Sequence, residues 1–192
     1  YFEKLLDNVL EIELQRYSRF FDAVGEHLDV VEFWGDLGTQ DAPMISPDLY
    51  RRVIKPRERQ LVDLVKEKTG ARAALHTCGA VFDFIPDIID AGYEVLNPVQ
   101  TTAAGMDPAL LKREFGQDIT FWGAIDTQRI LPFGTVEETR DEVRRIIDIM
   151  APGGGFIFAP CHNIQAMTPP ENVIAMYAAA AECGVYQKSG RH

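Results

Sequence analysis

The sequence predicts an α/β protein whose strands form a parallel β-sheet. Short apolar runs that are typical of strands alternate with longer segments whose apolar residues recur at helical spacing. Turn residues and helix caps separate the two kinds of segment. Because parallel strands are joined by helical crossovers, this order favours a parallel sheet. We expect residues 1–192 to form a single domain, since a chain of this length can bury a sizeable core.

The predicted strands share apolar runs that are bounded by turn residues. In chain order they cover residues 29–34, 72–75, 94–96, 119–122 and 156–159. The predicted helices share apolar residues at helical spacing. In chain order they cover residues 1–24, 46–69, 82–91, 107–116, 135–150 and 169–181. Five strands do not close an eight-stranded barrel, so the pattern leaves two architectures open: an open doubly wound sheet, or the second half of a barrel.

Local signals define where several helices begin and end. Ser46 caps the second helix with Pro47 at its first position, and Pro56 inside that helix should kink it. Gly92 closes the third helix as its C-cap. No Gly-x-Gly-x-x-Gly follows a predicted strand, which disfavours a dinucleotide-binding fold.

Two capping boxes are predicted for the last two helices. In a capping box, a Ser or Thr and a Glu three residues later satisfy each other's backbone N–H groups. Thr135 and Glu138 form the first. Thr168 and Glu171 form the second, with Pro169 at the first helical position.

The composition narrows the classes of function. The net charge of −10 argues against nucleic-acid binding, and no apolar run approaches the ~20 residues of a membrane span. Three cysteines are too few for a disulfide framework, so we expect reduced thiols and a cytoplasmic location, with Cys183 as core filler. The chain begins at Tyr1 without an initiator Met, so we expect it to be a piece of a longer protein.

The most informative motif is His-Thr-Cys-Gly at residues 76–79, followed far along the chain by Cys-His at residues 161–162. His76 and Cys78 are two apart on an extended segment and therefore point to the same side of a sheet. Together with Cys161 they supply three zinc ligands and leave a fourth position open, as in a catalytic site. Both motifs follow apolar runs, which places them at the carboxyl ends of strands, where parallel α/β folds bind ligands.

Other polar residues also follow the predicted strands. Two acids come after the first and fourth strands and could orient the ligating histidine, or serve only as helix caps or loop acids. Two amides follow the third strand and could bind substrate. The catalytic candidates are Asp36 and His162, and the substrate-binding candidates are Asn97, Gln100 and Asp126.

Several segments resemble the uroporphyrinogen decarboxylase superfamily. They are His-Thr-Cys-Gly at 76–79, Asp-Ala-Gly-Tyr-Glu-Val at 90–95, Trp-Gly-Ala-Ile-Asp at 122–126 and Pro-Pro-Glu-Asn-Val at 169–173. Within the superfamily the chain is most similar to the methylcobamide:thiol methyltransferase branch, from about Val30 to its end. The resemblance implies a (β/α)8 TIM barrel, of which residues 1–192 would be the C-terminal half.

The resemblance also implies the site. The zinc motif of this branch carries over as His76, Cys78 and Cys161, and the decarboxylases proper lack the two cysteines. A histidine that matches His162 is common to both branches. Relatives often have two adjacent acids where this chain has only Asp36, which is a departure from the family pattern.

The activity implied by the resemblance is zinc-dependent methyl transfer to a small thiol. The donor would be methylcobalamin or another methylcorrinoid carried by a separate corrinoid protein. One alternative is a decarboxylase that acts on a tetrapyrrole or another carboxylate. Another is a non-catalytic metal-binding domain, which a buried acid, Asp36 or Glu32, in the fourth zinc position would favour. We expect Trp34 and Trp122 in the barrel core rather than at a corrin-binding surface, and association into a homo-oligomer stays open.

Overall fold

The computed structural model describes residues 1–185 and confirms an α/β fold with a five-stranded parallel sheet. The strands are β1 (Val30–Trp34), β2 (Arg72–His76), β3 (Val95–Val99), β4 (Thr120–Ile125) and β5 (Phe156–Pro160). The helices are α1 (Phe2–Val24), α2 (Pro47–Leu49), α3 (Lys55–Lys68), α4 (Ile85–Ala91), α5 (Pro108–Phe115), α6 (Ile130–Phe133), α7 (Val136–Met150) and α8 (Pro170–Cys183). Strand order follows chain order, as in a portion of a (β/α)8 barrel.

The chain divides into two compact units, residues 1–97 and the residues from 98 onward, and β3 spans the division. A single domain over residues 1–192 stays a prediction. The short helical turn at Gly25–His27 and the short α6 were not predicted from the sequence, and the predicted helix over residues 82–91 consists of a 3₁₀ turn, Phe82–Phe84, followed by α4. Within residues 1–185, no helix combines the length and the hydropathy that a membrane span requires.

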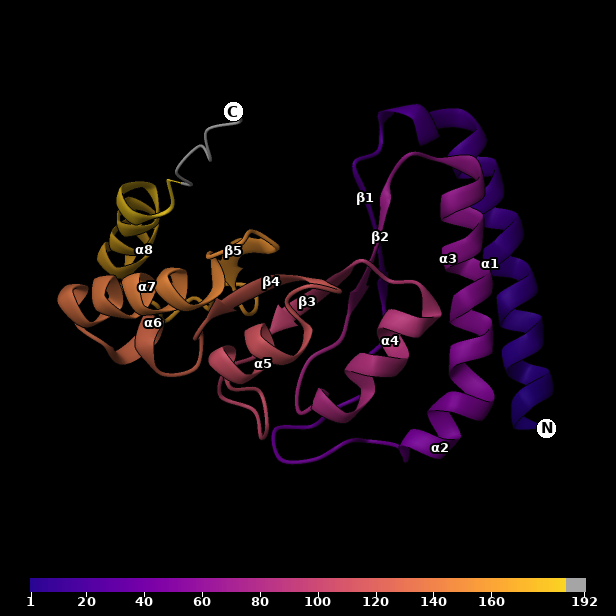
Figure 1. Cartoon of the computed structure of the whole chain (residues 1–192), viewed down its shortest axis with the longest axis horizontal. Coiled ribbons are helices and arrows are strands. Elements are labelled where there is room, and N and C mark those ends of the chain that lie inside the picture. Colours follow the sequence, from indigo (N-terminus) through magenta and orange to yellow (C-terminus); the bar gives the residue numbers. More distant parts are fainter. Residues whose placement is uncertain (186–192) are drawn as a thin grey trace. The chain divides into compact units, whose positions relative to one another are not determined.

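In the first unit, α1 and α3 run side by side, and α3 packs on β2 (Figure 1). β1 pairs with β2, and β2 with β3, in parallel. The Phe33 ring of β1 lies with its centroid 5.1 Å from that of Tyr17 and 6.4 Å from that of Tyr93. Because side chains alternate along a strand, Glu32 and Trp34 point to the opposite face of the sheet. That opposite face carries the candidate site.

In the second unit, β4 and β5 pair in parallel, and α7 packs against α5, α8 and β4 (Figure 1). Val143, Ile146 and Met150 are buried along one side of α7, at the spacing of a helix face. Thr135 and Glu138 make both hydrogen bonds of the predicted capping box, at 3.2 and 2.7 Å. The sequence therefore predicts this helix and its start correctly.

The long helix predicted between Ser46 and Thr69 consists of three pieces. A π-helical turn, Tyr50–Ile54, separates α2 from α3. Ser46 caps α2 as predicted and accepts a hydrogen bond from the Leu49 N–H at 3.2 Å. Pro56 has no N–H, and its ring clashes with the carbonyl one turn earlier in a regular helix. The wider π turn relieves that clash, so the predicted kink takes the form of a π-helical segment.

The second predicted capping box is wrong. α8 has Pro169 as its N-cap residue, and no side chain caps it. Thr168 is buried and lies outside the helix. The side-chain amide of Asn172 donates to the carbonyls of Leu131 and Gly134, at 3.0 and 2.7 Å. These contacts with a segment distant in sequence anchor the first turn of α8, so tertiary contacts override the local pattern.

Burial disfavours ionisation of the Glu58 carboxyl group in α3. The Tyr50 hydroxyl donates a hydrogen bond to Glu58 Oε2 at 2.6 Å. Burial raises the pKa of Glu58 from 4.5 to about 6, although the hydrogen bond from Tyr50 lowers it. A raised carboxyl pKa stabilises the folded state at low pH, and this contribution is lost as the pH rises from about 4.5 to about 6.

We therefore expect Glu58→Gln to raise the free energy of unfolding at neutral and alkaline pH. The gain should be roughly 2 kcal/mol at about pH 8 and close to zero at about pH 4, because one pKa unit corresponds to about 1.4 kcal/mol. Urea unfolding at both pH values measures it. Glu11→Gln, an exposed change in α1, is the control and should have no effect at either pH. Equal stability of Glu58→Gln and the wild type at about pH 8 would contradict the prediction.

Candidate functional site

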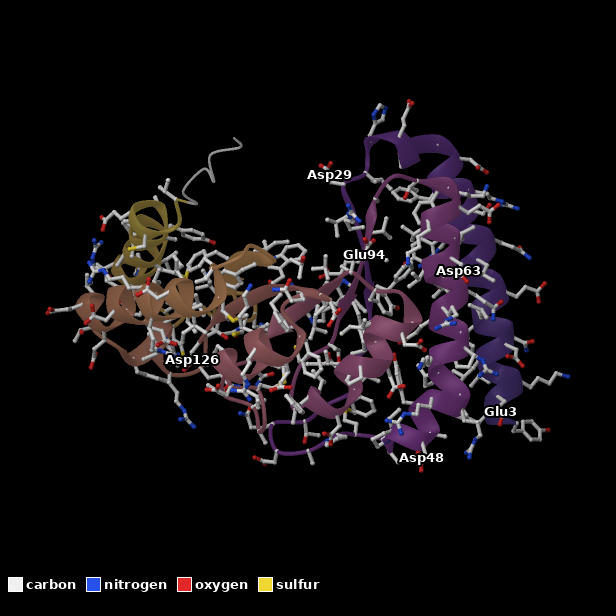
Figure 2. The ribbon with its side chains drawn as sticks, in the orientation of Figure 1. Glu3, Asp29, Asp48, Asp63, Glu94 and Asp126 are labelled. Atoms are coloured by element: carbon white, nitrogen blue, oxygen red, sulfur yellow. The ribbon has the colours of Figure 1, made fainter. Side chains whose placement is uncertain are left out.

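A row of side chains crosses the three strands of the first unit near their carboxyl ends. Trp34 of β1 pairs in register with His76 of β2, which pairs in turn with Asn97 of β3. Paired positions of neighbouring parallel strands point to the same face, so these three side chains are neighbours. Figure 2 labels Asp29 and Glu94, which lie just before β1 and β3 at the amino ends of these strands. The row therefore lies at the end of the sheet where parallel α/β folds bind ligands.

The loops that follow β1 and β2 touch through their backbones. Gly79 has a φ of +88°, and a Cβ on this residue would lie 2.5 Å from the carbonyl carbon of Gly38. A Cβ on Gly38 would lie 2.6 Å from the nitrogen of Ala80. The Ala80 N–H donates to the Thr39 carbonyl at 2.8 Å. Two glycines thus permit a backbone contact that places Cys78 beside the loop after β1.

Side chains strengthen the same connection. The buried Thr77 hydroxyl accepts a hydrogen bond from the Leu37 N–H at 2.9 Å. Asp36 Oδ1 accepts one from the Cys78 N–H at 2.8 Å. As a result, the carboxylate of Asp36 lies next to the thiol of Cys78, although the two residues are far apart in the sequence.

His76 and Cys78 present their donor atoms to one point. Cys78 Sγ lies 3.6 Å from His76 Nε2. Two ligands of one tetrahedral zinc ion, a sulfur at about 2.3 Å and a nitrogen at about 2.0–2.1 Å, are about 3.6 Å apart. A carboxylate oxygen of Asp36 joins them, and the three donor atoms lie within 4.8 Å of one another. The half-buried His76 and Cys78 therefore fit two positions of a tetrahedral zinc site.

The surroundings of Cys78 favour its protonated thiol form in the absence of a metal. Burial raises its pKa to about 11, and the charge of Asp36 and a hydrogen bond with it act in the same direction. A metal that binds Cys78 as a thiolate must therefore displace its proton. Metal binding at this site should release protons at neutral pH.

The remaining predicted site residues belong to the second unit. Cys161 is buried directly after β5, where its thiol donates to the Val99 carbonyl at 2.9 Å. The Asp126 carboxylate accepts hydrogen bonds from two backbone N–H groups that follow it, at 2.7 and 3.2 Å, and so caps the turn before α6. Gln100 is half-buried and His162 is exposed. A shared site of these residues with His76 and Cys78 stays a prediction.

Trp34 makes a contact that sequence reasoning missed. In this open five-stranded sheet it is 74% exposed and Trp122 is half-buried, so the place of both residues in the core of a closed barrel stays a prediction. The Trp34 ring stacks on the His76 imidazole, with centroids 4.3 Å apart and planes inclined by 9°. Asn97, predicted to bind substrate, has Oδ1 2.7 Å from His76 Nδ1. Strand alternation places these residues on one face, but only the register makes them neighbours.

Asp36 and Glu32, the two acids that could occupy the fourth zinc position, have different surroundings. Asp36 is exposed rather than buried. Glu32 is half-buried, and its buried Oε1 has no hydrogen-bond partner among the described residues. In register Glu32 pairs with Ala74, two residues before His76. Neither residue is the fully buried acid that would favour a non-catalytic site.

The chain is similar to known proteins of one family. Residues 2–183 match the family model for uroporphyrinogen decarboxylase (URO-D). A methylcobamide:CoM methyltransferase, MtaA of Methanosarcina barkeri, is 27% identical over 179 residues, which cover 93% of this chain and 49% of that protein. MtaA of M. barkeri strain Fusaro is 26% identical over 182 residues, again 93% of this chain and 49% of the relative. The chain thus spans about half the length of the curated relatives it matches.

A solved structure has a similar fold over most of this chain. The structure is that of a methyltransferase from Methanosarcina mazei, and it matches with a TM-score of 0.64 and 25% sequence identity. The match covers 82% of this chain and 43% of that one. Both MtaA relatives and this solved structure are named as methyltransferases.

Proposed function

Because the chain belongs to the uroporphyrinogen decarboxylase (URO-D) family, we propose that it acts in zinc-dependent methyl transfer from a methylcorrinoid to a small thiol. The observation that carries the proposal is the 3.6 Å separation of Cys78 Sγ and His76 Nε2, which suits two ligands of one tetrahedral zinc ion. The MtaA relatives, which are named for methyl transfer between a methylcobamide and CoM, support the same reaction class.

The proposed zinc ligands are His76, Cys78 and Cys161. Two thiolates and a neutral imidazole leave the site without net charge and with one position open to substrate. Zinc supplies one function when bound: it keeps a substrate thiol deprotonated at neutral pH. Cys78 is half-buried and Cys161 is buried, which limits the access of water and oxidants to these two sulfurs.

Other residues of the chain would hold these ligands and the substrate. Asp36, which accepts from the Cys78 N–H, fixes the backbone of one ligand and lies beside the thiol. His162 follows Cys161 and is exposed, so its imidazole is the proposed contact with substrate and the proposed carrier of the thiol proton. Gln100 and Asp126 follow β3 and β4, and we propose that they line the substrate cavity.

Protons, bonds and electrons balance in the proposed reaction. The substrate thiol loses its proton, and its sulfur forms a bond to the methyl carbon. The cobalt–carbon bond breaks, and its electron pair stays on the corrinoid. The methylcorrinoid would be carried by a separate corrinoid protein. Thiolate ligands persist in a reducing setting, so the proposal includes a cytoplasmic location.

The test is demethylation of methylcobalamin by the zinc-loaded protein with a panel of small thiols that includes coenzyme M. The corrinoid absorbance should change as the methyl group leaves, and the change should stop with a chelator or in Cys78→Ala. Cys183→Ala is the matched control, since Cys183 ends α8 and is no proposed ligand. Zinc-independent release of CO2 from a porphyrinogen, without demethylation of the corrinoid, would instead establish a decarboxylase.

A further inference from the structure

Trp34 and Asn97 are the two neighbours of His76 in the row of side chains that crosses β1, β2 and β3. We propose that Asn97 and Trp34 are positioning residues that hold His76 in the tautomer with Nδ1 protonated, so that Nε2 is the metal-binding atom. This inference rests on the proposed function for the role of the metal. The tautomer itself is a property of the metal-free protein and can be measured alone.

The hydrogen bond from His76 to Asn97 selects the tautomer. Asn97 Oδ1 lies 2.7 Å from His76 Nδ1. An amide oxygen only accepts hydrogen bonds, so Nδ1 must carry the proton and donate it. In a neutral imidazole the other nitrogen then has a free lone pair. That nitrogen, Nε2, is the one 3.6 Å from Cys78 Sγ, on the side of the candidate zinc position.

The Trp34 ring fixes the plane of the imidazole. The rings are nearly parallel, at 9°, with centroids 4.3 Å apart, so rotation of the imidazole would break the stack. Trp34 pairs with His76 in register, so both rings lie on one face of adjacent strands. At 74% exposure Trp34 fills no core space, and its replacement should leave folding intact.

The Asn97 amide differs from the usual partner of a ligating histidine. A carboxylate commonly accepts the free N–H of a metal-bound histidine and adds a negative charge there. Asn97 accepts the same hydrogen bond without that charge, at a site that already contains Asp36 and Cys78. Asn97→Asp therefore keeps the acceptor, whereas Asn97→Leu removes it. This pair of variants separates the hydrogen bond from the space that the side chain fills.

The first measurement is NMR of the full chain with 15N-labelled histidine, without metal, at about pH 8, well above the ordinary histidine pKa. Couplings between ring protons and nitrogens report the tautomer, and His76→Gln assigns the signals. We expect a protonated Nδ1 and an unprotonated Nε2 in the wild type and in Asn97→Asp. Asn97→Leu should lose this preference. An unprotonated Nδ1 in the wild type would overturn the proposal.

The second measurement is zinc affinity with zinc alone as the probe. Asn97→Leu should weaken it by roughly 10- to 100-fold, and Asn97→Asp should restore it. Trp34→Leu should weaken it roughly two- to tenfold, Trp34→Phe should stay close to the wild type, and Trp122→Phe is the control without effect. Wild-type affinity in both Asn97→Leu and Trp34→Leu would overturn the positioning role. The expected tautomer in a protein that binds no zinc would support the positioning role and refute the proposed function.

Discussion

Replacement of either predicted cysteine ligand is expected to abolish stoichiometric zinc binding. Structural zinc sites with four ligands are worth on the order of 10–16 kcal/mol, or roughly 2.5–4 kcal/mol per ligand, so loss of one of the three proposed ligands should weaken affinity on the order of 10²- to 10³-fold. Cys78→Ala and Cys161→Ala should therefore lose zinc during gel filtration, while Cys183→Ala retains it. Methyl transfer should be lost in the same two variants. Metal analysis of the purified proteins measures the effect.

Asp36→Asn decides between two sets of ligands. The donor atoms of Asp36, His76 and Cys78 lie within 4.8 Å of one another, so these three residues form the competing set. If Cys161 is the third ligand, Asp36→Asn should keep near-stoichiometric zinc. Loss of zinc in Asp36→Asn together with full retention in Cys161→Ala would refute the proposed ligand set.

Proton release gives an independent check on the same site. Because the pKa of Cys78 is raised to about 11, the thiol must lose its proton when zinc binds at neutral pH. Calorimetry in buffers of different ionisation enthalpy should therefore detect released protons. The release should fall in Cys78→Ala and stay unchanged in Cys183→Ala.

Gly79→Ala is expected to destabilise the protein more than a Gly→Ala substitution at a glycine that has open space around it. The φ of +88° costs an alanine roughly 1–2 kcal/mol, and the clash with the Gly38 backbone adds roughly 1–3 kcal/mol. The free energy of unfolding should fall by about 2–5 kcal/mol. Zinc affinity should fall as well, because the clash displaces the adjacent Cys78.

Gly153→Ala is the matched control for that change. Gly153 has a similar φ of +79°, but a Cβ there would meet nothing within 4 Å. Its cost should be only the conformational part, roughly 1–2 kcal/mol, with zinc affinity unchanged. Urea unfolding of both variants measures the difference. Equal losses in the two would show that the contact between the loops after β1 and β2 contributes nothing.

Local chemistry predicts most of the fold from the sequence. Strand and helix periodicity locate all five strands and the long helices, and cap signals at Ser46 and Thr135 hold in the structure. These features depend on residues within one or two turns of each other. The predictions fail where distant contacts dominate, as at α8, where Asn172 bonds to Leu131 and Gly134.

For the candidate site, the sequence by itself indicates the candidate ligand residues and places them at a strand end. The His-x-Cys spacing aims His76 and Cys78 to one side of a strand end, because side chains alternate along a strand. Only the tertiary structure decided what surrounds them. The register of β1, β2 and β3 brings Trp34 and Asn97 against His76, and the contact of Gly38 with Gly79 brings Asp36 to Cys78. Strand register and loop contacts join residues far apart in the chain, and local periodicity carries no information on either.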